Sequence, residues 1–181
     1  MAVRSAKRED LAAVLAIYRH YVETTAYSFE YTAPSMDAFV ARFEKICRQF
    51  PFFVWEEDGE ILGYAYADAP FERAAYAWCA EPSVYLHPNA RGRGIGKALY
   101  KALEEALTAQ GYRNLYAIIT TENADSIAFH KAVGYRHLAE FQNCGFKMGA
   151  WHGITWMEKQ LNLVESPTRM PVAYEQIVKY N

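Results

Sequence analysis

Hydrophobic residues recur along the first half of the chain with two different periods. Over two segments they fall at helical spacing, and over two others they form short apolar runs. The dipeptide Asp58-Gly59 separates the two runs, and this dipeptide is typical of tight β-hairpins. We therefore expect a short strand, two helices and two antiparallel strands, in the order residues 2–4, 9–23, 36–47, 52–55 and 61–66.

The second half of the chain alternates strands with helices. Residues 75–86 form a long extended stretch in which Pro82 cannot donate a hydrogen bond to a neighbouring strand, so we expect a bulge or splay near Glu81. The clearest helix covers residues 94–110, where apolar residues form one stripe and Gly111 follows as a terminator. The remaining expected elements are a strand, a helix capped by Asn123 and two more strands, over residues 115–120, 123–134, 136–146 and 154–161.

This order of elements predicts the fold class. Three early strands, a glycine-rich turn into a helix, and then strand, helix, strand and strand make a mixed α/β (α+β) architecture. Its central sheet should be mixed but mostly antiparallel, with about seven strands and with helices on both faces. The order is not that of a doubly wound fold. We expect one domain over residues 1–161 and a C-terminal arm over residues 162–181, where periodicity is weak.

Composition narrows the classes of partner. The 181 residues carry a formal net charge of −2 and 52% of them are hydrophobic, so neither disorder nor a polyanion-binding surface is indicated, and no nucleic acid partner is expected. No apolar run approaches the roughly 20 residues that span a bilayer, so no membrane contact is expected. The three cysteines are widely spaced, and no His, Cys, Asp or Glu group has metal-ligand spacing. We therefore expect no metal and a cytoplasmic location.

The most informative motif lies in residues 83–99, where a strand leads into a turn with three alternate glycines and the turn opens into a helix. Glycine lets the backbone approach a ligand closely, and the helix N-terminus adds partial positive charge, so this turn is suited to a diphosphate. Arg91 and Arg93 add two full charges. A flexible turn with a solvated basic face is the alternative. A Walker-type loop does not fit, because Lys97 is not followed by Ser or Thr.

Two motifs resemble those of the GNAT acetyltransferase family. Arg91-x-x-Gly94-x-Gly96 resembles the acetyl-CoA pyrophosphate motif, and residues 123–135 resemble the family's later helix, which leads from an asparagine to a Gly-Phe or Gly-Tyr pair. Over residues 2–161 the chain is similar to the phosphinothricin acetyltransferase branch of that family. The segments that carry this resemblance are Phe29-Glu30, residues 73–78, Glu81, Ser83-Val84-Tyr85, Phe129-His130 and residues 145–151.

The resemblance implies a GNAT fold that binds acetyl-CoA as a co-substrate where two central strands splay apart. The backbone of Val84 and Leu86 would bond pantetheine in the manner of a strand, and Asn123 and Ser126 would approach it from the following helix. A homodimer is common in the resembled branch and is therefore expected here. The pyrophosphate would be held by Arg91, Gly92, Arg93, Gly94, Ile95 and Gly96.

Two residues are candidates for the proton transfers. Acetyl transfer to an amine needs a base for the ammonium form and a proton for the departing thiolate. Glu81 lies in an otherwise apolar strand, where burial raises the pKa of a carboxyl group, and the resemblance places the base there; a rim carboxylate paired with Arg73 is the alternative. His130 stands where many GNAT enzymes carry the tyrosine that protonates the thiolate. A histidine there could act as acid or as base, or be a buried structural residue.

The acceptor side is expected to contain Arg73, Phe29 and Tyr76. A guanidinium in a partly apolar site suits a carboxylate or phosphinate group, and the resemblance places the two aromatic residues beside it; an ordinary loop arginine with core aromatics is the alternative. The expected reaction is acetylation of the α-amine of a small amino-acid-like acceptor, such as phosphinothricin, methionine sulfoximine or methionine sulfone, by direct attack on the thioester. Acetylation of a protein N-terminus or lysine, and a non-catalytic sensor of acyl-CoA, are the alternatives.

Overall fold

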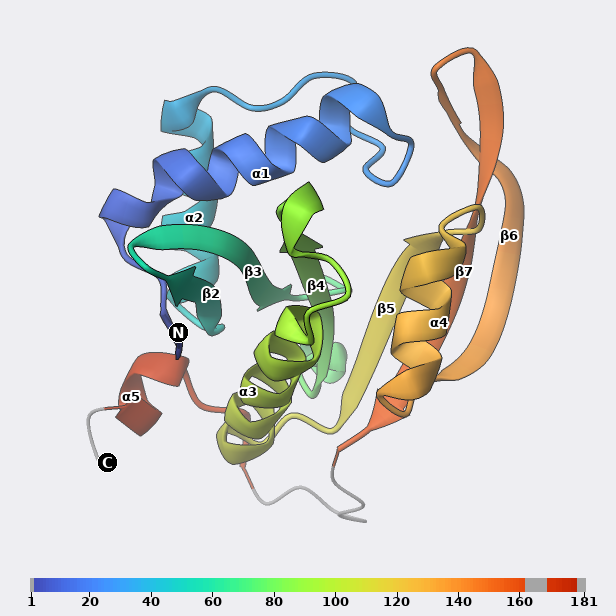
Figure 1. The fold of residues 1–181 in the computed structure, drawn as a ribbon. Helices are drawn as coiled ribbons and strands as arrows, with labels where there is room; N and C mark the ends of the chain where they lie inside the picture. Colours follow the sequence, from blue (N-terminus) through green and yellow to red (C-terminus); the bar gives the residue numbers. More distant parts are fainter. Residues whose placement is uncertain (1, 162–168, 179–181) are drawn as a thin grey trace.

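Seven strands form one sheet in the order β1-β2-β3-β4-β5-β7-β6 (Figure 1). The structure is a computed structural model, and it describes residues 2–161 and 169–178. Neighbouring strands are antiparallel except for β4 and β5, so the predicted mixed, mostly antiparallel sheet is confirmed. The strands are β1 (Ala2–Ser5), β2 (Phe52–Glu57), β3 (Glu60–Asp68), β4 (Cys79–Leu86), β5 (Asn114–Thr120), β6 (Arg136–Lys147) and β7 (Ala150–Gln160).

Helices cover both faces of the sheet, as predicted. Successive residues of β3 show this, because a Cβ atom added at Gly63 would lie 3.4 Å from Leu99 of α3, whereas Tyr64 stacks on Tyr85, which contacts Tyr18 of α1. Figure 1 shows α3 and α4 in front of the sheet and α2 behind it. The helices are α1 (Leu11–Thr24), α2 (Met36–Cys47), α3 (Ile95–Gln110), α4 (Ala124–Ala132) and α5 (Tyr174–Val178), with short 3₁₀ turns at Arg8–Asp10, Ala74–Tyr76 and Pro88–Ala90.

The helix α3 follows directly from its sequence pattern. Gly94 and Gly111 bound it with φ of +80° and +99°, a left-handed conformation that glycine adopts without strain. Between them, one apolar stripe is no more than 1% exposed and packs on the sheet, since it recurs every four residues. The stripe consists of Ile95, Leu99, Leu103 and Leu107.

Two predicted strand boundaries are wrong. The strand expected to begin at residue 75 begins at Cys79, and residues Ala74–Tyr76 form a 3₁₀ turn instead. The reason is that pairing with β3 reaches only to Glu81 and pairing with β5 only to Cys79, so the backbone before Cys79 has no strand partner, and residues 73–77 close on themselves. The strand expected from residue 154 begins at Ala150, because a two-residue turn with positive φ at both positions joins it directly to β6.

The centre of the sheet opens between β4 and β5. These strands pair only at Cys79 with Asn114 and at Ala80 with Leu115, and beyond those pairs they diverge. The register between β3 and β4 continues without a shift through Pro82. The predicted disruption near Glu81 is therefore confirmed as a splay on the β5 side, and it leaves one edge of β4 without a strand partner.

The described part of the C-terminal arm lies against the domain. Val172 and Gln110 exchange two hydrogen bonds, from the Val172 amide to the Gln110 carbonyl (3.0 Å) and from the Gln110 side chain to the Val172 carbonyl (2.8 Å). The ring of Tyr174 packs edge-on against Phe53, with centroids 5.6 Å apart. The rest of the predicted arm, residues 162–168 and 179–181, lies outside the described residues.

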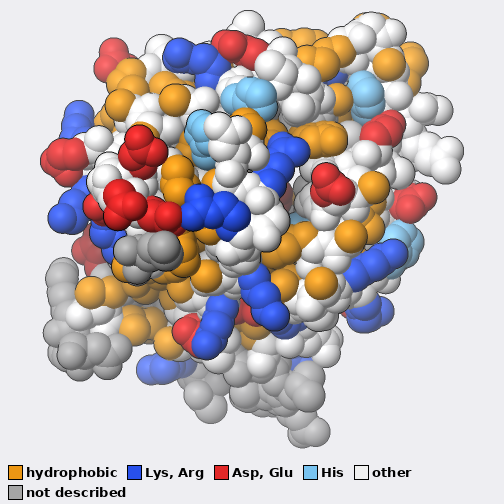
Figure 2. All heavy atoms as spheres, viewed as in Figure 1, with side chains coloured by type: hydrophobic (Ala, Val, Ile, Leu, Met, Phe, Trp, Pro, Cys, Tyr) orange, Lys and Arg blue, Asp and Glu red, His pale blue; other side chains and the backbone are white. Residues whose placement is uncertain are grey.

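The surface over α3 and α4 is mixed in character. Figure 2 shows Lys, Arg, Asp and Glu side chains interspersed on this face, with hydrophobic side chains between them. None of the helices among the described residues combines the length and apolarity that a membrane crossing requires.

Candidate active site

The splay between β4 and β5 opens into a cleft of about 330 Å³. Its walls come from β4, β5, the first turns of α3, and α4, and its mouth is bordered by α1 and the loop that follows it. The lining residues that matter most below are Tyr21, Leu86, Arg91, Gly96, Tyr100 and His130.

The glycine turn leaves space for a ligand at the start of α3. Gly92 and Gly94 have φ of +72° and +80°, and no protein atom lies within 4 Å of a Cβ atom added at either position. Gly96 is different, because its Cβ would contact Phe129 of α4 at 3.5 Å. The unpaired N–H groups of the first helical turn point toward this space, so the turn fits a diphosphate.

The two arginines of the turn point in different directions. The guanidinium of Arg91 borders the cleft, where it donates to the Tyr21 hydroxyl (3.2 Å) and lies 5.6 Å from the centre of that ring. Arg93 instead makes a two-pronged ion pair with Glu57 on β2, at 2.7 and 2.9 Å. The structure therefore brings Arg91 to the cleft and Arg93 to the opposite side of the turn. The side chain of Ile95 is 1% exposed in the core, so only its backbone faces the turn.

The free edge of β4 supplies strand-like hydrogen-bonding groups. Val84 and Leu86 pair with β3 on one side and have no strand partner on the other, where the cleft lies. The Leu86 carbonyl already accepts from the Tyr21 hydroxyl (2.7 Å). Across the cleft, the Asn123 side chain caps α4 by accepting from the Ser126 amide (3.2 Å), and both residues line the cleft. This arrangement fits the paired amides of a pantetheine arm.

Glu81 is the first residue of β4 beyond the last pair with β5. Strand alternation turns its side chain, with those of Ser83 and Tyr85, toward the α1 face. Asp68 lies directly opposite on β3, and burial together with this neighbouring carboxylate raises the pKa of Glu81 to about 7. No ion pair to Glu81 occurs within residues 2–161 or 169–178, so the alternative of a pair with Arg73 is not observed.

His130 belongs to a buried hydrogen-bond chain on the other face of β4. Its Nδ1 lies 2.7 Å from the Ser126 carbonyl, and since a carbonyl oxygen only accepts, this nitrogen carries the hydrogen. Its Nε2 therefore accepts, and the Tyr100 hydroxyl donates to it at 2.8 Å. Burial lowers the pKa of His130, so the imidazole is neutral near pH 7. The structure thus separates Glu81 and His130 onto opposite faces of one strand.

The predicted acceptor residues do not form one cluster. Phe29 lies in the loop after α1, with its ring against the backbone of Gly145 on β6. Arg73 and Tyr76 lie in the loop before β4 and are exposed. The ring of Tyr76 packs against Phe71, with centroids 4.6 Å apart. An aromatic wall on β5, β7 and the loop before β4 was missed by the sequence analysis; it consists of Phe71, Tyr116 and Trp156.

Tyr100 is the other residue that sequence reasoning missed. Its place in an amphipathic helix predicts only a packing residue, and it is 1% exposed. Its hydroxyl, however, lies at the splay, within 3.3 Å of the Pro82 carbonyl as well as beside His130. Its spacing in the sequence could have indicated this position, because Tyr100 lies four residues after Gly96 and therefore on the same face of α3 as the glycine turn. No cluster of three potential metal ligands occurs among the residues that the structure describes.

Comparisons with known proteins agree with this geometry. The family model of the acetyltransferase (GNAT) domain matches residues 3–156. A phosphinothricin N-acetyltransferase from Streptomyces viridochromogenes is 31% identical over 165 residues, covering 91% of this chain and 90% of that protein. An L-methionine sulfoximine/L-methionine sulfone acetyltransferase from Pseudomonas aeruginosa is 37% identical over 171 residues, covering 92% and 96%. A crystal structure of a phosphinothricin acetyltransferase from Sinorhizobium meliloti in complex with AcCoA has a TM-score of 0.89 at 35% identity, covering 96% of this chain and 97% of that one.

Proposed function

The chain belongs to the GNAT acetyltransferase family and is an N-acetyltransferase that uses acetyl-CoA, and from that premise we propose that its acceptor is the α-amine of a small amino-acid-like molecule. The acceptors that we consider first are phosphinothricin, methionine sulfoximine and methionine sulfone, because the relatives named above act on molecules of this class. The bound co-substrate would supply a thioester carbonyl that amines attack. The residues of the cleft would supply its binding, and the proton transfers would involve Glu81 on the α1 face of β4 and Tyr100 in the cleft.

The observation that carries the proposal is the placement of Glu81. It is the first residue of β4 without a partner on β5. It lies opposite Asp68 on β3 and has no cationic partner among the described residues. A carboxyl group whose pKa is near 7 is well matched to removing a proton from an ammonium group near neutral pH. We assign Glu81 as the general base, acting directly or through one water molecule.

Amide formation also requires a proton at the sulfur atom. Forming the C–N bond and breaking the C–S bond releases one proton from the amine and consumes one at the thiolate. Burial keeps the pKa of Tyr100 well above its ordinary value, so its hydroxyl is neutral, and the neutral imidazole of His130 holds it at the splay. We assign Tyr100 as the proton donor and His130 as its hydrogen-bonding partner, which makes His130 neither the primary acid nor the base.

The co-substrate contacts follow from the same cleft. The N–H groups at the start of α3 and the guanidinium of Arg91 would hold the pyrophosphate, and the free edge of β4 would hold pantetheine. Arg93 would have to leave Glu57 to take part, so we assign it a supporting role in the turn.

Acceptor choice is supported by two features. The aromatic wall of Phe71, Tyr116 and Trp156 suits the apolar portion of a side chain, and the exposed guanidinium of Arg73 is available for an acidic group. Exposed apolar residues at the tips of β6 and β7, such as Phe146 and Trp151, support a homodimer, which light scattering would test.

A screen for thiol release tests the proposal. The panel would contain the three acceptors, their decarboxylated analogues, a peptide with a free N-terminus and a lysine peptide, each with acetyl-CoA. We expect turnover of the intact amino acids and poor turnover of the decarboxylated analogues, with that difference lost in Arg73→Ala. Turnover of peptides alone would favour protein acetylation, and co-substrate binding without any thiol release would favour an acyl-CoA sensor.

A further inference from the structure

The loop after α1 bridges the open end of the splay. Residues 25–31, which we call the strap, leave α1, cross above the gap and reach β5, β6 and β7 before the chain returns to α2 (Figure 1). The Thr120 hydroxyl at the end of β5 donates to the Ala26 carbonyl (2.9 Å). Among the described residues, no backbone–backbone hydrogen bond forms within residues 26–34, so side chains from elsewhere hold the strap in place.

The strongest of these side chains is Lys147, at the end of β6. It is 4% exposed, and its ammonium group donates to the carbonyls of Val22 and Ser28, both at 2.7 Å. Val22 belongs to the last turn of α1, whose carbonyls carry partial negative charge and lack helical partners. One cation therefore ties the end of α1 and the middle of the strap to the far half of the sheet.

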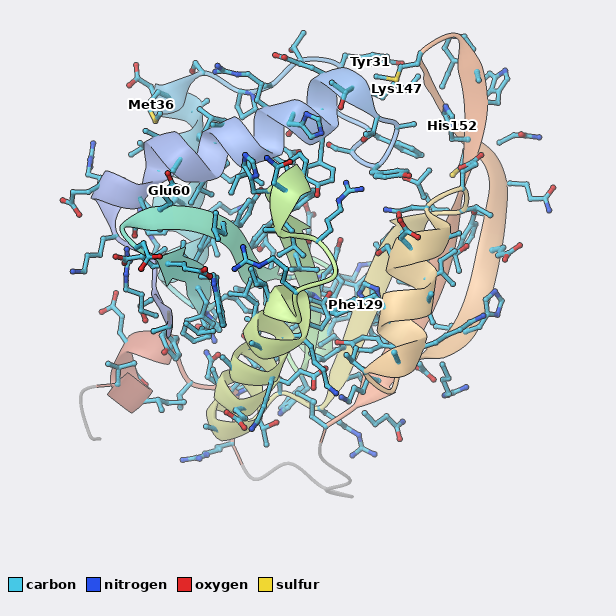
Figure 3. The ribbon with its side chains drawn as sticks, in the orientation of Figure 1. Tyr31, Met36, Glu60, Phe129, Lys147 and His152 are labelled. Atoms are coloured by element: carbon cyan, nitrogen blue, oxygen red, sulfur yellow. The ribbon has the colours of Figure 1, made fainter. Side chains whose placement is uncertain are left out.

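Neighbouring contacts reinforce this anchor. The Tyr31 hydroxyl donates to the Phe146 carbonyl (2.7 Å), and the Phe29 ring occupies the space that a side chain at position 145 would fill. The imidazole of His152 on β7 contacts the Lys147 carbonyl at 3.0 Å. Figure 3 shows Tyr31, Lys147 and His152 gathered where the strap meets the tips of β6 and β7.

The chemistry of this contact argues for a positioning role. Burial lowers the pKa of Lys147, which means that the fold gives up solvation of the ammonium group in order to place it there. Without the ammonium group, the Val22 and Ser28 carbonyls would lose their partner. The strap, which has little regular structure, would then be held across the gap only by the weaker contacts of Thr120, Tyr31 and Phe29. The strap also carries Phe29, one of the expected acceptor residues, and Tyr27, which lines the cleft.

We propose that Lys147 is a positioning residue that pins the strap across the splay and so fixes Phe29, the expected acceptor residue that the strap carries. The inference rests on the proposed function for its kinetic consequence but not for its structural one. The Lys147 ammonium group bonds to Val22 and Ser28 and to no residue of the glycine turn that would hold the pyrophosphate, so co-substrate binding should be affected much less than acceptor binding.

The test compares Lys147→Met with a matched control, Lys159→Met. Lys159 on β7 is also largely buried and also donates two hydrogen bonds at 2.7 Å, to Glu104 and to the Val133 carbonyl, but it lies on the far side of the sheet from the strap. We expect Lys147→Met to raise the KM of the acceptor by about 10-fold or more, in line with the loss of charge-assisted hydrogen bonds. The KM of acetyl-CoA should change by less than about 3-fold in both variants, and the acceptor KM should be unchanged in Lys159→Met.

Hydrogen exchange of the amides in residues 25–31 supplies a second readout that needs no turnover. Protection of the strap should fall in Lys147→Met and stay at the wild-type level in Lys159→Met. Equal losses of thermal stability with unchanged strap protection and unchanged acceptor KM would overturn the proposal. If the wild type acetylates none of the small acceptors, the proposed function fails. Hydrogen-exchange protection of residues 25–31 would then still decide whether Lys147 holds the strap in place.

Discussion

The two faces of β4 hold their ionisable groups in contrasting ways. On the α1 face, the Glu81 carboxyl group has another carboxylate, Asp68, as its cross-strand neighbour, and burial adds to the rise of its pKa. On the α3 face, the Tyr100 hydroxyl and the His130 imidazole satisfy each other, and the chain ends on a backbone carbonyl. Glu81 thus has no ion-pair partner among the described residues, whereas the Tyr100 hydroxyl shares its hydrogen with the neutral imidazole of His130. Under the proposed mechanism, proton removal and proton delivery would therefore take place on opposite faces of β4.

The largest expected effect comes from Glu81→Gln, which keeps the shape of the side chain but cannot accept a proton. General bases contribute about 10²- to 10⁴-fold, so kcat/KM should fall by an amount in that range near neutral pH. The loss should be smallest at high pH, where the amine is already free. Thiol release followed over a pH series measures this loss. A wild-type pH profile in the variant would show that Glu81 is not the general base.

The same variant should shift the pH dependence of stability. The pKa of Glu81 is raised from 4.5 to about 7 in the fold, so the folded protein binds a proton more tightly than the unfolded chain does. The free energy of unfolding of the wild type should therefore decline as pH rises through the interval between those two values, and Glu81→Gln should lack that decline. Thermal unfolding at several pH values checks the sign, and parallel curves for the two proteins would contradict it.

Tyr100→Phe should have the next largest effect, on the opposite face. Loss of the hydroxyl should lower kcat by about 10- to 100-fold at every pH, less than loss of the base, because a thiolate is a comparatively good leaving group. Binding of acetyl-CoA should be retained. Tyr135→Phe is the matched control, since Tyr135 is also buried and packs 5.1 Å from the His130 ring but is not among the residues that line the cleft. Equal rates in the two variants would remove Tyr100 from the chemistry.

The glycine turn offers a comparison within the α3 face. Arg91→Ala should weaken acetyl-CoA binding by about 10-fold, as expected for one charge-assisted contact. Arg93→Ala should change it by less than about 3-fold, because that guanidinium is paired with Glu57 at an exposed site. Calorimetric titration of both variants measures the difference. Equal losses would mean that Arg93 exchanges partners when the ligand binds.

The smallest expected effect is that of Asp68→Asn, which removes the neighbouring negative charge from Glu81. The pKa of Glu81 should fall, so the acid limb of the kcat/KM profile should move to lower pH by roughly 0.5 pH unit, a value typical of a like-charge pair near a surface. A structural defect would lower the whole profile without moving it. An unmoved limb would leave burial as the sole cause of the raised pKa.

Local patterns predicted most of the fold because they report burial directly. The stripe of α3 and the Asp58-Gly59 turn each specify one conformation, so both elements appear where expected. The start of β4 could not be predicted in this way, because its first two residues, Cys79 and Ala80, pair only with the distant strand β5. When a partner strand determines where a strand begins, the local sequence pattern does not show that boundary.

The candidate site was predictable where a residue departs from the pattern of its neighbours. The glycine turn could be predicted because its conformation requires glycine. Glu81 could be predicted because it is a charged residue in an otherwise apolar strand. Neighbouring arginines look equivalent in sequence, yet the turn directs Arg91 and Arg93 to opposite sides. Tyr100 has the same periodicity as its core neighbours, and only the splay of a distant strand exposes its hydroxyl to the cleft.

The splay also has a consequence for where the two substrates bind and how the products inhibit the enzyme. Because the strands part beyond two residue pairs, the cleft borders one side of β4, whereas the Glu81 side chain points toward the α1 face. If acetyl-CoA occupies the cleft and the amine reaches Glu81 outside it, the two substrates would occupy different parts of the enzyme. CoA should accordingly compete with acetyl-CoA but not with the amine, a pattern that product-inhibition kinetics would reveal.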